Sequence, residues 1–161
     1  MENKKKKVAL FIDHDNIRIG LKNQNIFYDL NKLIDRINED GVVVAGKSYI
    51  TLKENEDMSR KENFFYEHFK RGIDPVFTPL YNEKSLGDPI LICDCMEILY
   101  DKQEIDMFVI VSGDKDMIPL IRQIAKKGKD ILVIGVNDTS ANALIKEVNR
   151  LGYKYEDYES I

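Results

Sequence analysis

Short apolar segments alternate with longer amphipathic segments along almost the whole chain, and this alternation constrains the fold more than any other feature. The apolar segments are rich in β-branched and aromatic residues, as buried strands are. They lie at residues 8–12, 42–52, 107–111 and 131–136. Strands that alternate with helices pair in parallel, through right-handed crossovers, and carry helices on both faces. The pattern therefore predicts an α/β fold with a three-layer, Rossmann-like, doubly wound parallel sheet.

The intervening segments place apolar residues at the spacing of one helix face. We predict helices at residues 28–38, 63–70, 88–102, 116–127 and 141–151. Shorter strands are expected at residues 74–78 and 153–155, and loops or turns at residues 53–61, 81–87 and 137–140. Gly41, Gly72 and Gly128 follow predicted helices, which favours helix termination at these points.

The length of 161 residues matches one domain, since domains typically contain about 100–150 residues. We predict a flexible basic tail over residues 1–7 and a single domain over residues 8–161. The lysines at positions 4–7 of this tail are expected to add a weak, nonspecific attraction for phosphate.

No apolar run approaches the roughly 20 residues that span a bilayer. Residues 8–12 are also too few for the apolar core of a signal peptide, which has about 7–15 residues. We therefore expect a cytoplasmic protein that does not contact a membrane.

Cys93 and Cys95 lie one residue apart in a predicted helix and point to different faces, so two buried free thiols are expected rather than a disulfide or a zinc site.

Acidic residues follow two of the predicted buried strands. Asp13 ends the first strand, Asp114 follows the strand at residues 107–111, and Asp88 opens the helix before that strand. Ligands of such sheets bind outside the carboxyl ends of the strands, so these acids are expected at one rim. Clustered carboxylates repel one another unless a cation compensates, and hard oxygen ligands suit Mg²⁺ or Mn²⁺. The net charge of −4 argues against a general nucleic-acid coat, but not against a metal-dependent nuclease.

Four of the polar residues near this rim also have a purely structural interpretation. Asp88 and Asp116 are each suited to cap the N-terminus of a helix, Asp88 directly before Pro89. Asp15 and Asn16 are typical of a turn after a strand.

Asp94 lies within the apolar run at residues 90–96. It is either a partly exposed helix position or a buried acid with a partner, which would make it a supporting residue of the site. Asp13 and Asp114 are the hardest acids to explain structurally, because an unpaired carboxylate at the end of a buried strand costs free energy.

Three motifs occur in order along the chain. They are Phe-Ile-Asp-His-Asp-Asn at residues 11–16, the segment from Lys84 to Asp88 with Asp94 farther on, and Val-Ser-Gly-Asp-Lys-Asp-Met-Ile-Pro-Leu at residues 111–120. Together with Gly128 and the strand at residues 131–136, these motifs resemble the NYN domain family, in the LabA-like branch of the PIN-like nucleases. The resemblance extends from residue 8 to about residue 155.

The resemblance implies a metal-dependent endoribonuclease with RNA as its substrate, and PIN-like domains often form homodimers. The residues that would hold Mg²⁺ or Mn²⁺ are Asp13, Asp88, Asp114 and Asp116. The supporting residues would be Asn16 and Ser112, with Asp94 and Asp15 as further candidates. Lys84 would meet a phosphate of the substrate. A bound cation lowers the pKa of water to generate the nucleophile, and a second cation stabilises the leaving oxygen.

The sequence departs from the family pattern at His14, where a small residue is usual, and at Met117, where phenylalanine is more frequent. His14 adjoins the predicted site and is either a substrate-side residue or a structural one, whereas His68 lies in an aromatic helical segment and is interpreted as structural. Arg18 is a candidate for substrate binding, and it shares a face with Lys22 if that segment is helical.

Two other functions are compatible with acids at this rim. In a haloacid-dehalogenase-like phosphatase, Asp13 would be the nucleophile and Asp15 the general acid, although Asn16 and the lack of room for a cap insertion count against it. In a non-catalytic module, the same rim would bind RNA or a protein partner, because a fold does not establish an activity.

Overall fold

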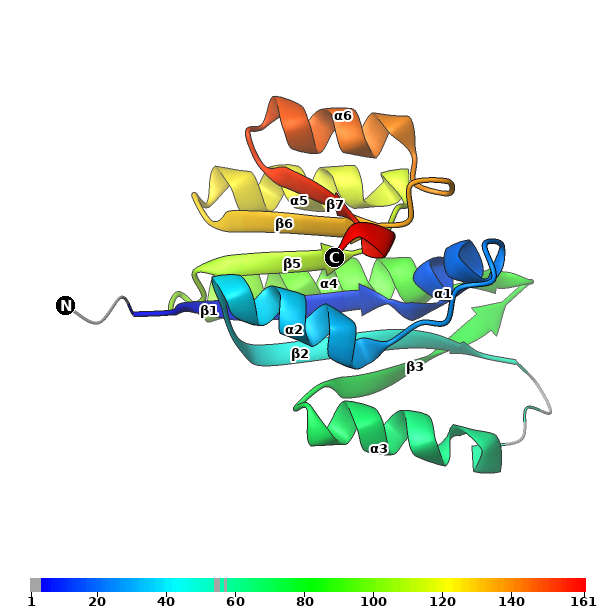
Figure 1. Ribbon diagram of the computed structural model, residues 1–161. Coiled ribbons are helices and arrows are strands. Elements are labelled where there is room, and N and C mark those ends of the chain that lie inside the picture. Colours follow the sequence, from blue (N-terminus) through cyan, green and yellow to red (C-terminus); the bar gives the residue numbers. More distant parts are fainter. Residues whose placement is uncertain (1–3, 54–55, 57) are drawn as a thin grey trace.

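A computed structural model of the protein describes residues 4–53, 56 and 58–161, and it contains one mixed sheet with helices on both faces (Figure 1). The strands are β1 (Lys6–Asp13), β2 (Gly41–Leu52), β3 (Asp74–Tyr81), β4 (Lys84–Ser85), β5 (Met107–Val111), β6 (Asp130–Gly135) and β7 (Lys154–Asp157). The α-helices are α1 (His14–Lys22), α2 (Leu30–Asp40), α3 (Glu62–Lys70), α4 (Gly87–Asp101), α5 (Ile118–Lys126) and α6 (Asn142–Arg150). Short 3₁₀ turns cover Met58–Lys61, Lys115–Met117 and Tyr158–Ser160.

The strand order is β4-β3-β2-β1-β5-β6-β7, and every pair is parallel except the short β3–β4 hairpin. The chain builds outward from β1 to β3, returns through α4 to β5 on the other side of β1, and then builds outward to β7. This order confirms the predicted doubly wound sheet. The reversal of strand order lies between β1 and β5, which is where ligands of such folds bind.

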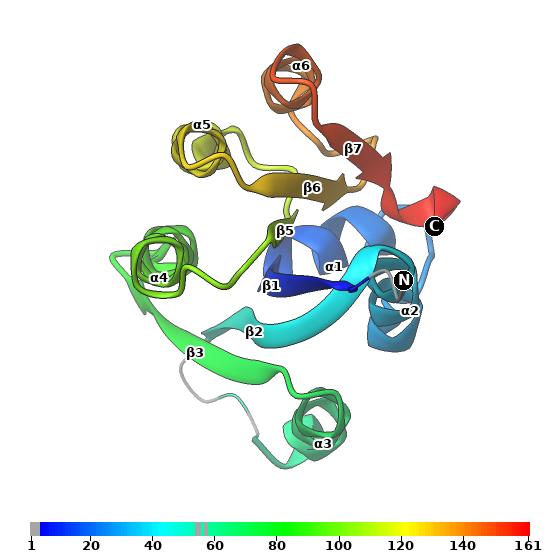
Figure 2. The ribbon, with the colours of Figure 1, turned by 90° about the vertical axis from the view of Figure 1, so that its left-hand side faces the viewer.

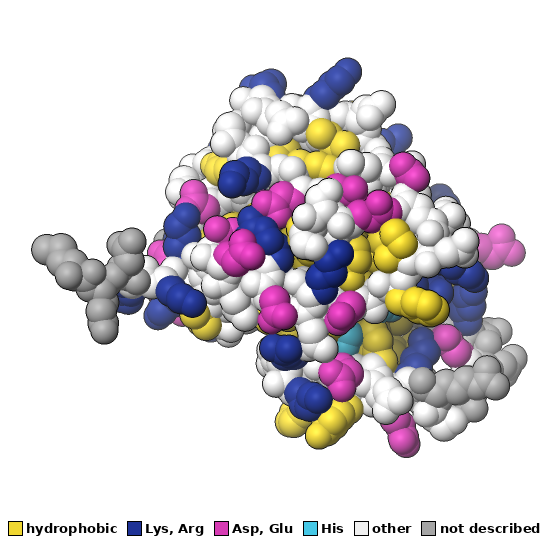
Figure 3. All heavy atoms as spheres, in the orientation of Figure 1, with side chains coloured by type: hydrophobic (Ala, Val, Ile, Leu, Met, Phe, Trp, Pro, Cys, Tyr) yellow, Lys and Arg dark blue, Asp and Glu magenta, His cyan; other side chains and the backbone are white. Residues whose placement is uncertain are grey.

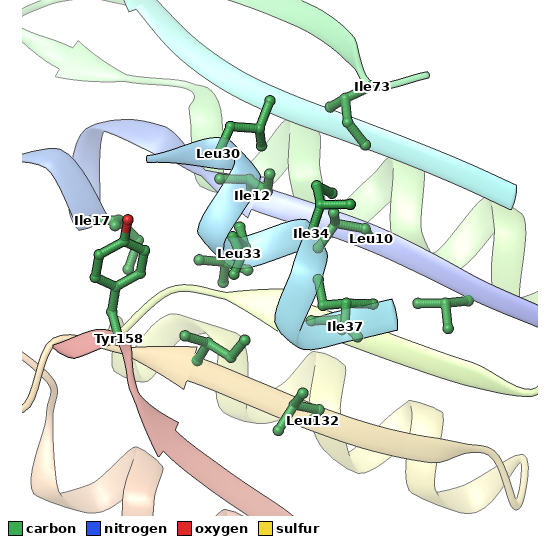
Figure 4. Close-up of a cluster of buried hydrophobic side chains, with 14 of the residues drawn as sticks. Leu10, Ile12, Ile17, Leu30, Leu33, Ile34, Ile37, Ile73, Leu132 and Tyr158 are labelled. Carbon is green, nitrogen blue, oxygen red and sulfur yellow. The ribbon is translucent and has the colours of Figure 1, made fainter. Parts of the chain in front are cut away.

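Alternate residues of β1 pack into two separate cores. Leu10 and Ile12 face α1 and α2, where they join a cluster of buried aliphatic side chains (Figure 4). Ala9 and Phe11 face the opposite layer, formed by α4, α5 and α6. Figure 2, which looks along the strands, shows α4, α5 and α6 on one face and α1 and α2 on the other. Both faces of β1 are therefore buried, which explains its continuous apolar sequence.

The structure differs from the sequence-based expectations in several local elements. Helix α1 was not predicted, because only Ile17, Gly20 and Leu21 of its later residues are buried while Ile19 is exposed, which blurs the helical pattern. The loop expected at residues 81–87 contains the strand β4, and the loop expected at residues 53–61 contains a 3₁₀ turn at Met58–Lys61. Residues 54, 55 and 57 of that loop lie outside the described residues.

Two further expectations need correction or adjustment. Strand β1 begins at Lys6, so Lys6 and Lys7 belong to the sheet and not to the tail, and residues 1–3 lie outside the described residues. The expectation of two buried thiols was wrong for Cys93, which is exposed, whereas Cys95 is buried. Within the described part of the chain, no helix is long and apolar enough to cross a membrane.

A candidate metal centre at the switch point

Asp13 is the last residue of β1 and lies at the reversal of strand order, with only 8% of its surface exposed. Its Oδ1 accepts a hydrogen bond from the backbone amide of Asn16 at 3.4 Å, so Asp13 also caps α1. The hydroxyl of Ser112 donates to Oδ2 at 3.1 Å. Burial raises the pKa of Asp13 above its usual range, and these hydrogen bonds partly oppose that shift by favouring the charged form.

The loop after β5 is held beside Asp13 by a chain of hydrogen bonds. The amide of Asp114 donates to Ser112 Oγ at 3.2 Å, and the amide of Asp116 donates to Asp114 Oδ1 at 2.8 Å. From the first turn of α1, the side-chain oxygen of Asn16 accepts a hydrogen bond from the amide of Gly113 at 2.9 Å. Ser112 and Asn16 therefore join the end of β1 and the start of α1 to the loop after β5.

Gly113 fits this loop because it has no side chain. A Cβ atom there would lie 2.8 Å from the Cα atom of Ser140, closer than real Cβ contacts allow. The carbonyl of Gly113 also accepts a hydrogen bond from the amide of Ala141 at 2.9 Å, which ties the loop to the start of α6. The close approach of Gly113 to Ser140 fixes the position of the backbone just before Asp114, which caps the 3₁₀ turn at Lys115–Met117.

Three acids meet in front of Asp13. Asp88, Asp114 and Asp116 each offer a carboxylate oxygen, and these oxygens lie within 4.8 Å of one another. Asp88 comes from the first turn of α4, and the other two come from the loop and 3₁₀ turn after β5. We call these three residues the acid cluster.

The capping interpretation is wrong for both Asp88 and Asp116. Helix α4 begins at Gly87 with Leu86 in the capping position, so Asp88 lies inside the first turn. The residue that caps the 3₁₀ turn is Asp114, which accepts from the amide of Asp116. The placement of Asp88 and Asp116 is therefore not explained by helix capping.

Burial, followed by the neighbouring charges of Asp13 and Asp114, raises the pKa of Asp88 to about 8. Asp88 is close enough to both neighbours to share a proton with them. A group of carboxylates that retains a proton near neutral pH is electrostatically unsatisfied, and a divalent cation would relieve that repulsion. The donors are all hard carboxylate oxygens, so the residues present fit Mg²⁺ or Mn²⁺.

A hollow of about 770 Å³ opens in front of Asp13, Asp88 and Asp114. Its cationic lining residues are Arg18, Lys53 and Lys61. Elsewhere, acidic and basic side chains are interspersed over the face that carries α2 (Figure 3). The hollow therefore carries both cationic and acidic side chains, the latter including Glu56 and Glu83.

Two of the predicted supporting acids form hydrogen bonds with residues outside the cluster. The side chain of Asp15 accepts a hydrogen bond from the amide of Thr51 at 2.8 Å, which joins α1 to the end of β2. Asp94 accepts a hydrogen bond from the hydroxyl of Tyr49 at 2.8 Å and lies 3.6 Å from the ammonium group of Lys47. The Asp15–Thr51 and Asp94–Tyr49 hydrogen bonds hold the walls of the hollow in position, because Tyr49, Thr51 and Asp15 all line it.

The remaining predicted residues divide between the hollow and its surroundings. Arg18 is exposed and lines the hollow. Lys84 is exposed on β4, and its neighbours Glu83 and Ser85 line the hollow instead. His14 lines the hollow but is only 7% exposed, because its ring packs edge-on against Phe64.

Lys53, Lys61 and Phe64 line the hollow but were not identified from the sequence as site residues. Lys61 forms an ion pair with Glu56 at 3.0 Å, and its side chain is only 18% exposed. Lys53 and Lys61 come from the connection between β2 and α3, and Phe64 comes from α3 itself. The sequence of that connection has no periodic pattern. Acids at the ends of strands can be predicted from the sequence more readily than the path of an irregular connection.

A doubly wound sheet with clustered aspartates at its switch point defines the class of PIN-like, nuclease-like α/β domains. The NYN domain family model matches residues 7–153, which is nearly the whole chain. The chain therefore belongs to the NYN domain family, whose members are generally ribonuclease domains and typically use divalent metals.

The other comparisons agree with this fold. An uncharacterized protein of Methanocaldococcus jannaschii is 27% identical over 138 residues, a match that covers 86% of this chain and 51% of that protein. The chain thus spans about half the length of the curated relative it matches. A crystal structure of a protein of unknown function from Vibrio parahaemolyticus is similar with a TM-score of 0.77 and 22% identity, covering 98% of this chain and 94% of the other. This similarity concerns the fold alone.

Proposed function

We propose that this protein is a metal-dependent endoribonuclease that hydrolyses phosphodiester bonds of RNA at the rim between β1 and β5. Asp13, Asp88, Asp114 and Asp116 would hold Mg²⁺ or Mn²⁺. The observation that carries the proposal is the meeting of the acid cluster's oxygens within 4.8 Å, beside Asp13, in a chain of the NYN family. A bound cation would supply a more acidic water and neutralise charge on the reacting phosphate.

The chain's own residues would prepare the site for this chemistry. Ser112 and the amide of Asn16 orient the carboxylate of Asp13, while the amide of Asp116 orients that of Asp114. These hydrogen bonds favour the charged forms, which are the forms that bind a cation.

The walls of the hollow would bind the substrate. Arg18, Lys53 and Lys61 line the hollow and would contact phosphates of the substrate, and Lys84, exposed on β4, would contact another phosphate of the same RNA strand. We assign His14 to the wall of the hollow, where its buried ring would limit how closely a substrate approaches Asp13.

The position of Asp15 disfavours the phosphatase alternative. A general acid must reach the leaving group on the substrate. Asp15 lines the hollow, but its Oδ2 atom accepts a hydrogen bond from the amide of Thr51, which ties this carboxyl group to the end of β2.

Incubation of the purified protein with single-stranded RNA and Mn²⁺ tests the proposal. We expect internal cleavage that stops when a chelator is added and no hydrolysis of para-nitrophenyl phosphate. The Asp114→Asn protein, purified identically, controls for contaminating ribonuclease. Hydrolysis of the small ester with intact RNA would indicate a phosphatase, and RNA binding without turnover under any divalent cation would indicate a binding module.

Addition of Mg²⁺ or Mn²⁺ is expected to raise the melting temperature, and to raise it more at pH 8.5 than at pH 6. A cation that binds only the folded protein stabilises it by about 2.7 kcal/mol at 100 times its dissociation constant. Because the pKa of Asp88 is raised to about 8, its proton must leave before the cation binds, so protons compete more strongly at low pH. Differential scanning fluorimetry across this pH range measures the effect, and a shift that shrank with rising pH would contradict it.

A further inference from the structure

A second hollow adjoins the acid cluster. It is formed by the N-terminal parts of α4, α5 and α6 and has a cavity volume of about 740 Å³. Apart from charged residues at its edge, it is lined by Pro89, Ile92, Cys93, Ile118, Pro119 and Ala143. We call these six residues the proline groove. Its surface is mainly apolar, unlike that of the first hollow.

The acid cluster separates the two hollows. Asp88 lines both of them, Asp114 lines only the first, and Asp116 lines only the second. A phosphate that binds at the cluster would therefore have one hollow on each side. In a nucleic acid each phosphodiester links two nucleosides, so the nucleoside on one side of such a phosphate is within reach of the proline groove.

We propose that the proline groove binds the nucleobase next to the phosphate held at the acid cluster, an inference that rests on the proposed ribonuclease function. The flat ring of a base would be removed from water against Pro89, Ile92 and Pro119. Lys115, which is exposed at the edge of the groove, is placed to meet the next phosphate of the same strand.

The chemistry of the groove also indicates which bases it accepts. The six residues contact a ring face, which every base has, and they offer no side-chain amide or carboxylate to read a base edge. Recognition would therefore depend weakly on the identity of the base. It would require an unpaired base, because the ring faces of a duplex are stacked on their neighbours.

Cys93 provides a direct measure of occupancy. It is exposed and lines the groove, whereas Cys95, the other cysteine of the sequence, is buried. The experiment measures the rate at which a maleimide alkylates Cys93, with Mn²⁺ present, in the full chain. The probes are a hydrolysis-resistant phosphorothioate RNA hexamer, an abasic hexamer with the same backbone, and inorganic phosphate.

We expect the RNA hexamer to slow alkylation on the order of 10-fold, and the abasic hexamer and phosphate to leave it unchanged. Equal protection by the abasic hexamer would overturn the proposal. So would an unchanged rate while fluorescence anisotropy shows the RNA hexamer bound. Protection that appears when only the protein concentration is raised would identify the groove as a contact between two copies, and would also overturn it.

A pair of variants gives a second readout. Ala143→Glu adds a carboxylate inside the groove, whereas Asn142→Glu adds one to the adjacent residue, which does not line it. Both residues lie in the first turn of α6, where an acid favours the helix. Ala143→Glu should raise the KM for RNA by several-fold with little change in kcat, and Asn142→Glu should change neither. Equal effects of the two variants on KM would overturn the proposal that the proline groove binds a base. The absence of cleavage in the unmodified protein would overturn only the proposed function.

Discussion

Asp88→Asn is expected to abolish metal-dependent RNA cleavage and, in the same protein, to raise the melting temperature of the metal-free form. Loss of residues that merely support metal ligands typically costs 10–100-fold in metal affinity or activity, so loss of a ligand should reduce kcat/KM by more than ~100-fold. Asparagine keeps the size of the side chain but cannot carry the charge that a cation would neutralise.

The gain in stability follows from the raised pKa of Asp88. Its folded value is about 8 and its ordinary value is 3.8, so the folded protein holds this proton more tightly than the unfolded chain does. The unfolded chain therefore binds fewer protons between about pH 4 and pH 8, and the metal-free protein loses stability as pH rises through this window. Asparagine mimics the protonated form and removes that loss.

The expected difference between the two metal-free proteins is small near pH 5 and grows toward pH 8.5. Because part of the carboxyl group faces solvent, screening leaves an effect on the order of 1 kcal/mol. For a chain of this size this is about 2–4 °C in melting temperature. Thermal unfolding with a chelator present, at several pH values, measures it.

Asp101→Asn is the matched control. Asp101 is the last residue of α4 and is exposed, so the same chemical change is made in the same helix but far from the cluster. It should change neither cleavage nor the pH dependence of stability. A metal-free Asp88→Asn protein that is less stable than the unmodified protein at pH 8.5 would contradict the electrostatic origin of the effect.

Phe108→Ala is expected to lower the free energy of unfolding by about 3–5 kcal/mol, the usual cost of removing a buried phenylalanine ring. Phe108 lies on β5 with none of its surface exposed, and its ring is parallel to that of Phe11 on β1, with centroids 6.4 Å apart. The substitution would leave a cavity in the core that joins the two central strands. Domains are stable by only about 5–15 kcal/mol, so this is a large fraction of the total.

Phe27→Ala removes the same ring at a position that is 94% exposed and serves as the control. Its effect should stay within about 0.5 kcal/mol. Urea denaturation of the three proteins, followed by far-UV circular dichroism, gives the two differences. Similar losses for the two variants would show that the β1–β5 core contributes less than its burial indicates.

The sheet could be predicted from the sequence because strands that are buried on both faces are continuous apolar runs. A strand such as β5 consists only of apolar residues, and its ends are marked by a change to polar ones. Short or irregular elements have no such pattern in the sequence. Helix α1 escaped prediction because Asp15 and Asn16 form its first turn, and residues of these types are also common in turns.

The prediction of the metal centre depended on one rule of topology. Asp13 and Asp114 were placed together because parallel strands end at one rim, and the structure brings them there. The rule does not say where side chains point. It could not show that Asp94 bonds to Tyr49 rather than to a residue of the cluster. The contribution of Lys61 to the hollow depends on a connection with no regular pattern, so sequence periodicity could not reveal it.

The hydrogen bonds that join β1 and α1 to the loop after β5 have a consequence for when the proposed centre can form. Ser112 bonds to Asp13 across 99 residues of chain, and Gly113 bonds to Asn16 across 97. A growing chain that ends before β5 contains Asp13 and Asp88 but neither Asp114 nor Asp116. Such a chain cannot assemble the acid cluster. The proposed centre can therefore form only after β5 has been made and has paired with β1.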